Sequence, residues 1–300
     1  MNPITVSLRK PYTAAPLGHK TDGPRILVFD IETMPMNSWH WRTRKEFISA
    51  EQTTVYGRLL SWSAKWLDSD AVLFDSAEKD IRAHQQAVLE SWQGARRANV
   101  NPFEWYAYDD SRLCQSIWEL CNRADMLVAH NGRAFDVGFL QARWAAHRIV
   151  PPAPYKMCDT LKVARSQFAV PSRSLDTLVR YFEMGAKLAH TGWDMWLSCM
   201  ECNRKAWAMM EEYNIQDTLL LQDLYLIVRP WDRRHPNMAL CYEDGETRCV
   251  VCGSRNMTEL AEPARTAVSR FPAFRCDKCG HVMRSGKREK LGKDVLRNAV

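Results

Sequence analysis

Residues 25–32 constrain the fold most, because four consecutive apolar residues run directly into two acids. A short apolar run bounded by polar residues is typical of a strand that is buried on both faces. Residues i and i+2 of a strand point to the same side, so Asp30 and Glu32 share a side at the strand's carboxyl end. Two carboxylates there are costly unless water or cations compensate their charge. The pattern predicts a central strand that carries an acidic site.

The rest of the chain up to residue 228 shows strand patterns first and mixed strand and helix patterns later. We expect strands over residues 59–66, 71–74 and 126–129, the first two as a hairpin, and helices over residues 110–123, 135–147, 159–169, 174–181, 194–210 and 210–228. Residues 79–108 are polar and partly helical, and we interpret them as an insertion. This order favours an α/β sheet flanked by helices.

Two further places carry acids in a suggestive pattern. Asp136 stands at the start of a predicted helix, and Tyr213 and Asp217 lie four residues apart, on one face of another. Four carboxylates at one sheet edge would bind hard divalent ions such as Mg²⁺. Two such ions about 3.5–4 Å apart clamp the attacking and leaving oxygens of a phosphodiester. A phenol beside the metals is suited to orient the attacking water.

At these residues the sequence resembles the tyrosine subclass of the DEDD superfamily of 3′–5′ exonucleases. The motifs are Phe29-Asp30-Ile31-Glu32-Thr33, then Leu-Val-Ala-His-Asn-Gly at residues 127–132 followed by Phe135-Asp136, then Tyr213-Asn-Ile-Gln-Asp217. The histidine subclass would need a histidine where Glu212 stands. The resemblance covers roughly residues 25–228. It extends to the proofreading domains of family A and B polymerases and to stand-alone exonucleases of bacteriophages and bacteria.

The resemblance implies a ribonuclease H-like mixed sheet and two Mg²⁺ or Mn²⁺ ions held by Asp30, Glu32, Asp136 and Asp217. Asp30 would bridge both ions, and Tyr213 would position the nucleophilic water. Contacts to the terminal nucleotide are implied for Thr33, His130 and Asn131. Taken singly, each acid also fits a solvated strand end or a favourable helix N-terminus, and Tyr213 fits an ordinary half-buried position. The three motifs in order favour the catalytic interpretation.

Four cysteines near the end of the chain form a second pattern. Cys249 and Cys252, and then Cys276 and Cys279, make two CxxC pairs separated by 23 residues, each followed by a glycine. Four thiolates suit one tetrahedral Zn²⁺, and a glycine lets each knuckle turn tightly. We expect a zinc ribbon over residues 248–300 whose small core needs the metal to fold. The alternative is four free buried thiols.

The ribbon's tail adds positive charge, because residues 284–297 carry six Lys and Arg against two acids. Such a module is suited to grip nucleic acid, although a solvated tail or a docking site for a replication or repair protein fits equally. Trp39 and Trp41 follow the first motif together with Arg42, Arg44 and Lys45, and this loop suits stacking on a single strand as well as capping the sheet edge.

The predicted organisation has four parts: a flexible arm over residues 1–24, a ribonuclease H-like domain over residues 25–228, a linker over residues 229–247, and the ribbon over residues 248–300. The net charge of +6 is compatible with nucleic acid but does not establish it. The sequence contains no apolar run of 18 residues, which argues against a membrane span. No signal-peptide pattern occurs near Met1, so we expect a cytoplasmic protein, in the host if phage-encoded.

These patterns together predict a two-metal-ion 3′–5′ exonuclease. It would release nucleoside 5′-monophosphates from single-stranded DNA or from frayed 3′ ends of duplex DNA. Two alternatives stay open. RNA trimming by the same fold is one, because the acids act on the phosphate and not on the sugar. A catalytically inactive nucleic-acid-binding module led by the ribbon is the other.

Overall fold

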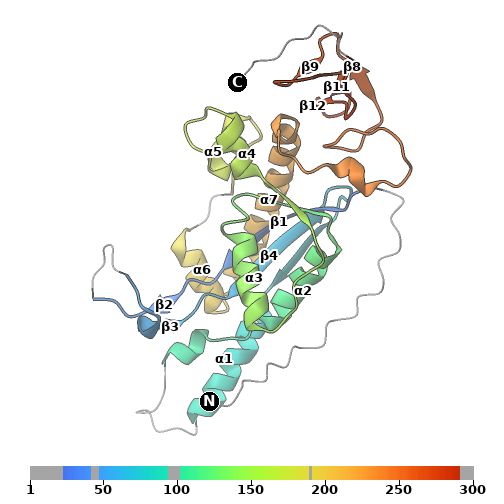
Figure 1. Ribbon diagram of the computed structural model, residues 1–300. Helices are drawn as coiled ribbons and strands as arrows, with labels where there is room; N and C mark the ends of the chain where they lie inside the picture. Colours follow the sequence, from blue (N-terminus) through green and yellow to red (C-terminus); the bar gives the residue numbers. More distant parts are fainter. Residues whose placement is uncertain (1–22, 42–46, 94–101, 189–190, 291–300) are drawn as a thin grey trace.

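The computed structural model describes residues 23–41, 47–93, 102–188 and 191–290 (Figure 1). Nearly all of the arm predicted over residues 1–24 therefore lies outside the described residues. The same holds for the end of the basic tail and for residues 94–101 of the predicted insertion.

A five-stranded mixed sheet forms the centre of the molecule, in the order β5-β4-β1-β6-β7. Its strands are β1 (Ile26–Thr33), β4 (Leu59–Trp66), β5 (Val72–Ser76), β6 (Met126–Ala129) and β7 (Lys156–Asp159). β4 runs antiparallel to both β1 and β5, whereas β6 runs parallel to β1 and β7. The predicted mixed sheet with an apolar central strand is confirmed.

Helices cover both faces of this sheet (Figure 1). They are α1 (Glu78–Gln93), α2 (Ser111–Arg123), α3 (Asp136–Ala146), α4 (Thr160–Gln167), α5 (Leu175–Tyr181), α6 (Trp193–Met200) and α7 (Arg204–Val228). Side chains alternate along β1, so Leu27 and Phe29 join the core beneath α2 and α3, while Val28 joins the core beneath α4, α5 and α7. Within the described residues, no helix is both long and apolar enough to cross a membrane.

One helix junction and three short strands differ from the sequence prediction. The break between α6 and α7 falls at residues 201–203 instead of 210, where Cys202 has φ +57° and the Asn203 side chain caps α7 by accepting from the amides of Lys205 and Ala206. β7 was missed because its residues lie between prolines and a helical pattern. The short pair β2 (Asn37–Ser38) and β3 (Thr53–Val55) is not predicted, because its residues are mostly polar and too few to show an apolar alternation.

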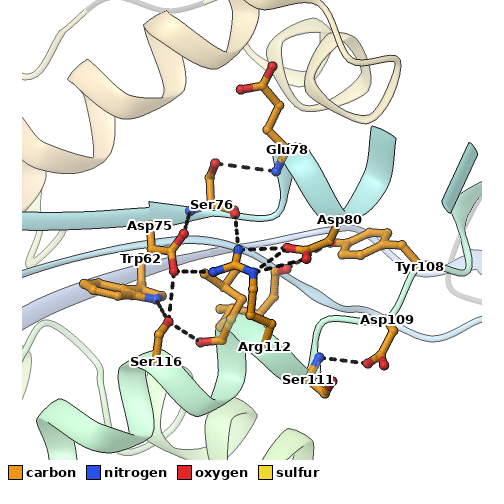
Figure 2. A network of polar contacts seen from close by, with 12 residues as sticks. Trp62, Asp75, Ser76, Glu78, Asp80, Tyr108, Asp109, Ser111, Arg112 and Ser116 are labelled. Atoms are coloured by element: carbon orange, nitrogen blue, oxygen red, sulfur yellow. Dashed lines mark hydrogen bonds and ion pairs between the residues drawn. The ribbon is translucent and has the colours of Figure 1, made fainter. Parts of the chain in front are cut away.

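The segment interpreted as an insertion is anchored to the sheet by Arg112 of α2. Its guanidinium contacts Asp75 of β5 at 2.6 Å, Asp80 of α1 at 2.8 Å and the Ser76 carbonyl oxygen at 2.7 Å (Figure 2). One planar group thus joins a strand and two helices through several charge-assisted hydrogen bonds. The short 3-10 turn η3 (Pro102–Tyr106) follows on the same side and contacts α1.

Two short turns, η4 (Arg229–Trp231) and η5 (Met238–Cys241), lead from α7 to a small C-terminal unit. This unit contains the three-stranded sheet β12-β11-β8 and the pair β10-β9, formed by β8 (Met257–Glu259), β9 (Ala264–Arg265), β10 (Arg270–Phe271), β11 (Ala273–Cys276) and β12 (Val282–Arg284). The segment interpreted as a linker is packed: Met238 is buried beside α7, and its amide donates to the Val250 carbonyl oxygen at 2.7 Å.

Candidate active site and metal centre

The carboxyl half of β1 places two acids on one face of the sheet. Asp30 pairs with Ser63 of β4, and Glu32 pairs with Ser61. The register then shifts between Glu32 and Thr33, so regular pairing ends just beyond the acids. The strand therefore presents both carboxylates towards α7, at the point where the chain leaves the sheet.

Helix α7 is held against β4 by a ladder of buried polar contacts. The Ser61 hydroxyl donates to Asn214 Oδ1 at 3.1 Å, and the Ser63 hydroxyl donates to the Asn214 carbonyl oxygen at 2.7 Å. Ser63 also contacts the Thr218 hydroxyl. Asn214 Nδ2 in turn donates to Asp30 Oδ2 at 2.8 Å. Because hydrogen bonds are directional, the ladder fixes the rotation and height of α7, and thereby of Tyr213 and Asp217.

Asp136 reaches the same region from the other side of β1. It is the first residue of α3 and only 3% exposed, and the backbone amides of Asp136 and Ile31 bond its carboxylate. The preceding turn is tight: a Cβ on Gly132 would lie 2.4 Å from Ala129 Cβ. Glycine at this position therefore lets β6 turn directly into α3, which brings Asp136 back to the sheet edge.

The four predicted acids interact electrostatically. The pKa of Asp30 is raised well above its ordinary value by burial and by repulsion from Glu32, Asp136 and Asp217. Burial, then Asp217, raises the pKa of Glu32 to about 8, and burial raises that of Asp136 to about 7. Mutual repulsion of this kind arises where several carboxylates share one poorly solvated space, and such a space favours cations.

Tyr213 lies beside these acids as the i, i+4 spacing predicts. Its side chain is hydrogen-bonded to Asp217, and burial followed by the charges of Asp217, Glu32 and Asp30 raises the pKa of its phenol. The phenol therefore stays protonated at neutral pH, with its single O–H engaged by Asp217 and its oxygen still able to accept a hydrogen bond.

Sequence analysis missed two residues at this site. Lys187, from the segment between α5 and α6, contacts Asp217 Oδ2 at 2.5 Å, and its ammonium lies 5.5 Å from the centre of the Tyr213 ring. Trp196 of α6 hydrogen-bonds Glu32. Neither residue lies at a fixed spacing from a motif, so only the folded chain brings them to the acids.

The residues predicted to contact the terminal nucleotide lie around this cluster. Thr33 ends β1. Both ring nitrogens of His130 are engaged, with Thr160 Oγ1 at 2.9 Å and with the Arg173 carbonyl oxygen at 2.9 Å. Asn131 has φ +66°, and its backbone amide donates to the Asp159 carboxylate. His130 and Asn131 line an open groove together with Arg165, Ser172, Arg173 and Ser174.

The four acids and the four cysteines differ in how tightly they gather. Within the described ranges, no three of these acids bring their ligand oxygens within 4.8 Å of one another, whereas all four cysteine sulfurs meet that limit. The four acids are therefore spread more widely than the four cysteine sulfurs.

The cysteine cluster fits one structural Zn²⁺. The Cys249 and Cys279 sulfurs lie 3.6 Å apart, and those of Cys252 and Cys276 lie 3.5 Å apart. Ligands at about 2.3 Å from a tetrahedral zinc would be separated by about 3.8 Å. Gly253 and Gly280 have φ +71° and +81°, the left-handed conformation that the knuckle glycines were expected to provide.

A second candidate ligand group, Asp110 with Cys114 and His147, already has protein partners. Asp110 accepts hydrogen bonds from His147 Nε2 at 2.6 Å, from the Leu59 amide at 2.8 Å and from Arg143. Burial would raise the pKa of Asp110, but these hydrogen bonds outweigh burial and lower it. The group joins α2, α3 and β4 and so supports the helix that begins at Asp136.

The sheet order and its flanking helices define an RNase H-like fold. Residues 84–228 match the RNase_H_2 model of the RNase H superfamily. This range is just under half of the chain and includes Asp136, Tyr213 and Asp217, but it begins after Asp30 and Glu32.

Among solved structures, the chain is similar to the family B DNA polymerase from the hyperthermophilic archaeon Pyrobaculum calidifontis, with 16% identity and a TM-score of 0.37. That similarity covers 70% of this chain and 26% of the polymerase, so the chain spans about a quarter of that protein's length. A search of curated proteins gave no match.

Proposed function

We propose that the protein is a metal-dependent 3′–5′ exonuclease that acts on single-stranded DNA ends. The observation that carries the proposal is the gathering of four acids where β1, α3 and α7 of an RNase H-like fold meet, with Asp136 and Asp217 buried and Asp30 and Glu32 partly buried. Four carboxylates that repel one another cost free energy of folding, and bound divalent ions remove that cost. The motifs quoted from the sequence supply the 3′–5′ polarity.

The chain's own residues divide the work in this proposal. Asp30, Glu32, Asp136 and Asp217 would hold two Mg²⁺ or Mn²⁺ ions, which when bound stabilise the attacking and leaving oxygens. Tyr213 would orient the water through its protonated phenol. The Lys187 ammonium supplies a fixed positive charge beside the site of phosphate attack.

Exposed aromatic side chains support a single-stranded substrate. Trp39, Trp41 and Phe47 are 65%, 92% and 88% exposed, and they belong to the β2–β3 region that follows the acids of β1. Bases of a single strand stack on such exposed rings whatever their sequence. Unpaired bases next to the scissile phosphate would cover them.

The proposal includes the division of the chain into a nuclease domain over residues 25–228 and a zinc module over residues 248–300, joined by residues 229–247. RNA trimming by the same acids is the second candidate activity, since the RNase H-like fold is shared and the acids would act on the phosphate and not on the sugar. An inactive binding module is disfavoured because all four acids and Tyr213 are present.

The deciding experiment is digestion of 5′-labelled single-stranded DNA with Mg²⁺ or Mn²⁺. The wild type should give a descending ladder, and a 3′-labelled strand should lose its label at the first step. Asp30→Asn should lower turnover by about 10³-fold, because a carboxylate shared by both ions contributes several kcal/mol. Asp223→Asn, an exposed acid on α7, is the matched control. Equal turnover by wild type and Asp30→Asn would refute the proposal, and matched RNA strands distinguish the two activities.

A further inference from the structure

Positive charge in this chain is concentrated in the zinc module. Residues 248–300 carry 12 Lys and Arg against 5 Asp and Glu, a net charge of +7. Residues 1–247 carry 29 against 30, a net charge of −1. The whole positive excess therefore belongs to about a sixth of the chain, and the part that holds the candidate active site is close to neutral. A polyanion is attracted mainly to the module.

Some of the module's cations already have acidic partners. Arg248 and Arg255 contact Asp244, Arg265 contacts Glu262, and Arg270 contacts Glu289. The cations with no carboxylate partner among the described residues are Arg275, Lys278, Arg284, Lys287, Arg288 and Lys290. All six are exposed. Their charges are available to an external anion.

The strand register places two of these exposed cations on one face of the module's sheet. Arg275 pairs with Val282, and Arg284 pairs with Ala273, so Arg275 and Arg284 point to the same side of β11 and β12. The other side packs Cys276 and Met283 around the cysteine cluster. Arg284 lies 4.0 Å above the Phe271 ring, which holds its guanidinium in place. A zinc-supported sheet thus presents an ordered basic face.

We propose that this face, with residues 287–290 that follow it, anchors the phosphate backbone of a nucleic-acid strand. Charge complementarity and the row of unpaired cations identify the ligand as a polyanion with repeated phosphates. The proposal adds a second contact point to the candidate active site. The module that carries this face lies beyond the carboxyl end of α7, where His281 contacts the Pro230 carbonyl oxygen at 2.8 Å.

The separation of the two points predicts a length dependence. The 11 residues from Asp217 to Val228 span about 16 Å along α7 at about 1.5 Å per residue. A strand must therefore be several nucleotides long to reach from the acids to the module. Shorter strands would occupy the acids without touching the module.

The test measures binding alone, in full-length protein carrying Asp30→Asn so that the strand stays intact. Fluorescence anisotropy is recorded with labelled DNA and RNA strands of about 20 nucleotides at roughly 50 to 200 mM salt. The test variant is Arg275→Gln, Lys278→Gln, Lys287→Gln. The control is Arg255→Gln, Arg265→Gln, Arg270→Gln, which removes the same charge from ion-paired positions of the same module. Zinc content verifies folding of both.

The test variant should bind about tenfold more weakly than the control, and its log–log salt slope should fall by about 2, since each phosphate contact to a single strand contributes about 0.7. DNA and RNA should lose affinity alike. Titrations that superimpose on those of the control, or a loss confined to one polymer, would overturn the proposal. If the variant loses zinc, a second triple variant is tested in its place, which combines Lys278→Gln, Lys287→Gln and Arg288→Gln. These three residues lie outside the strands. Because no turnover is measured, an inactive enzyme would leave this result unchanged.

Discussion

At the scale of single residues, Lys187 is the cation that offsets the acidic site. It lowers the pKa of Asp30 and Glu32, against the effects of burial and the other carboxylates. We expect Lys187→Met to lower turnover by about 10²-fold, the usual cost of removing one preorganised charge or donor. Lys156→Met, an exposed residue at the start of β7 and level with the first residue of β1, should change it little. The readout is kcat on a labelled single strand, and an unchanged kcat would reduce Lys187 to a structural ion pair.

The raised pKa values of Glu32 and Asp136 predict a pH dependence of the metal-free protein. The folded state keeps these groups protonated up to about pH 8 and about pH 7, whereas the unfolded chain ionises them near 4.5 and 3.8. The stability that they contribute is present below these lower values and is lost as pH rises through the folded pKa values. Thermal unfolding should therefore show a falling Tm over this range.

Divalent ions should reverse that loss, because they bind the ionised carboxylates. Mg²⁺ or Mn²⁺ should raise Tm more at about pH 8 than at about pH 6. Glu32→Gln should flatten both the pH dependence and the metal response. A metal-induced rise in Tm that is the same at both pH values, or that survives in Glu32→Gln, would show that the ions bind elsewhere.

The residues of the candidate site fall into two groups by how the sequence encodes them. Asp30 and Glu32 share a side because of strand period, and Tyr213 and Asp217 because of helix period, so local geometry alone brings each pair together. Lys187 reaches Asp217 through the packing of a connecting segment, which no local period describes. Such a contact becomes visible only once the chain is folded.

At the scale of elements, the polar ladder between β4 and α7 decides where the acids meet. Asn214 is fully buried and links Ser61 to Asp30. Asn214→Ala should lower the free energy of unfolding by about 2 kcal/mol, because it leaves buried polar groups without partners, and it should also lower turnover. Leu219→Ala, on the exposed side of the same helix, should do neither. Denaturant unfolding with parallel rates measures both, and loss of stability without loss of rate would limit Asn214 to packing.

Element boundaries were predictable where the spacing of apolar residues follows one period without interruption. They were not predictable where two elements follow each other directly. The apolar run of β1 and the helical spacing of α2 predicted both elements to within one residue at each end. The junction of α6 and α7 was displaced because apolar residues continue through it, and only the left-handed Cys202 and the Asn203 cap mark the break. β7 has four residues, too few to show a period.

At the scale of the whole molecule, the zinc module and the RNase H-like sheet meet through the end of α7. Met238 is buried with Leu224 and Val228, and its amide donates to Val250 in the module. His281, two residues after Cys279, contacts Pro230. Loss of zinc should therefore loosen residues 229–247 as well as the module, while the ladder that holds Asp30 and Asp217 stays formed.

Hydrogen exchange measured after chelation of zinc tests whether the module loosens while the central sheet stays formed. Amides of β8, β11 and β12 and of Met238 should lose protection, because a unit with so small a core depends on its metal. Amides of β1 and of α7 around Asp217 should keep theirs, since their partners lie in the central sheet. Cys276→Ser should reproduce the chelated pattern without exposing the acids to a chelator. If protection is lost throughout α7, zinc supports the candidate active site itself, and module and sheet form one cooperative unit.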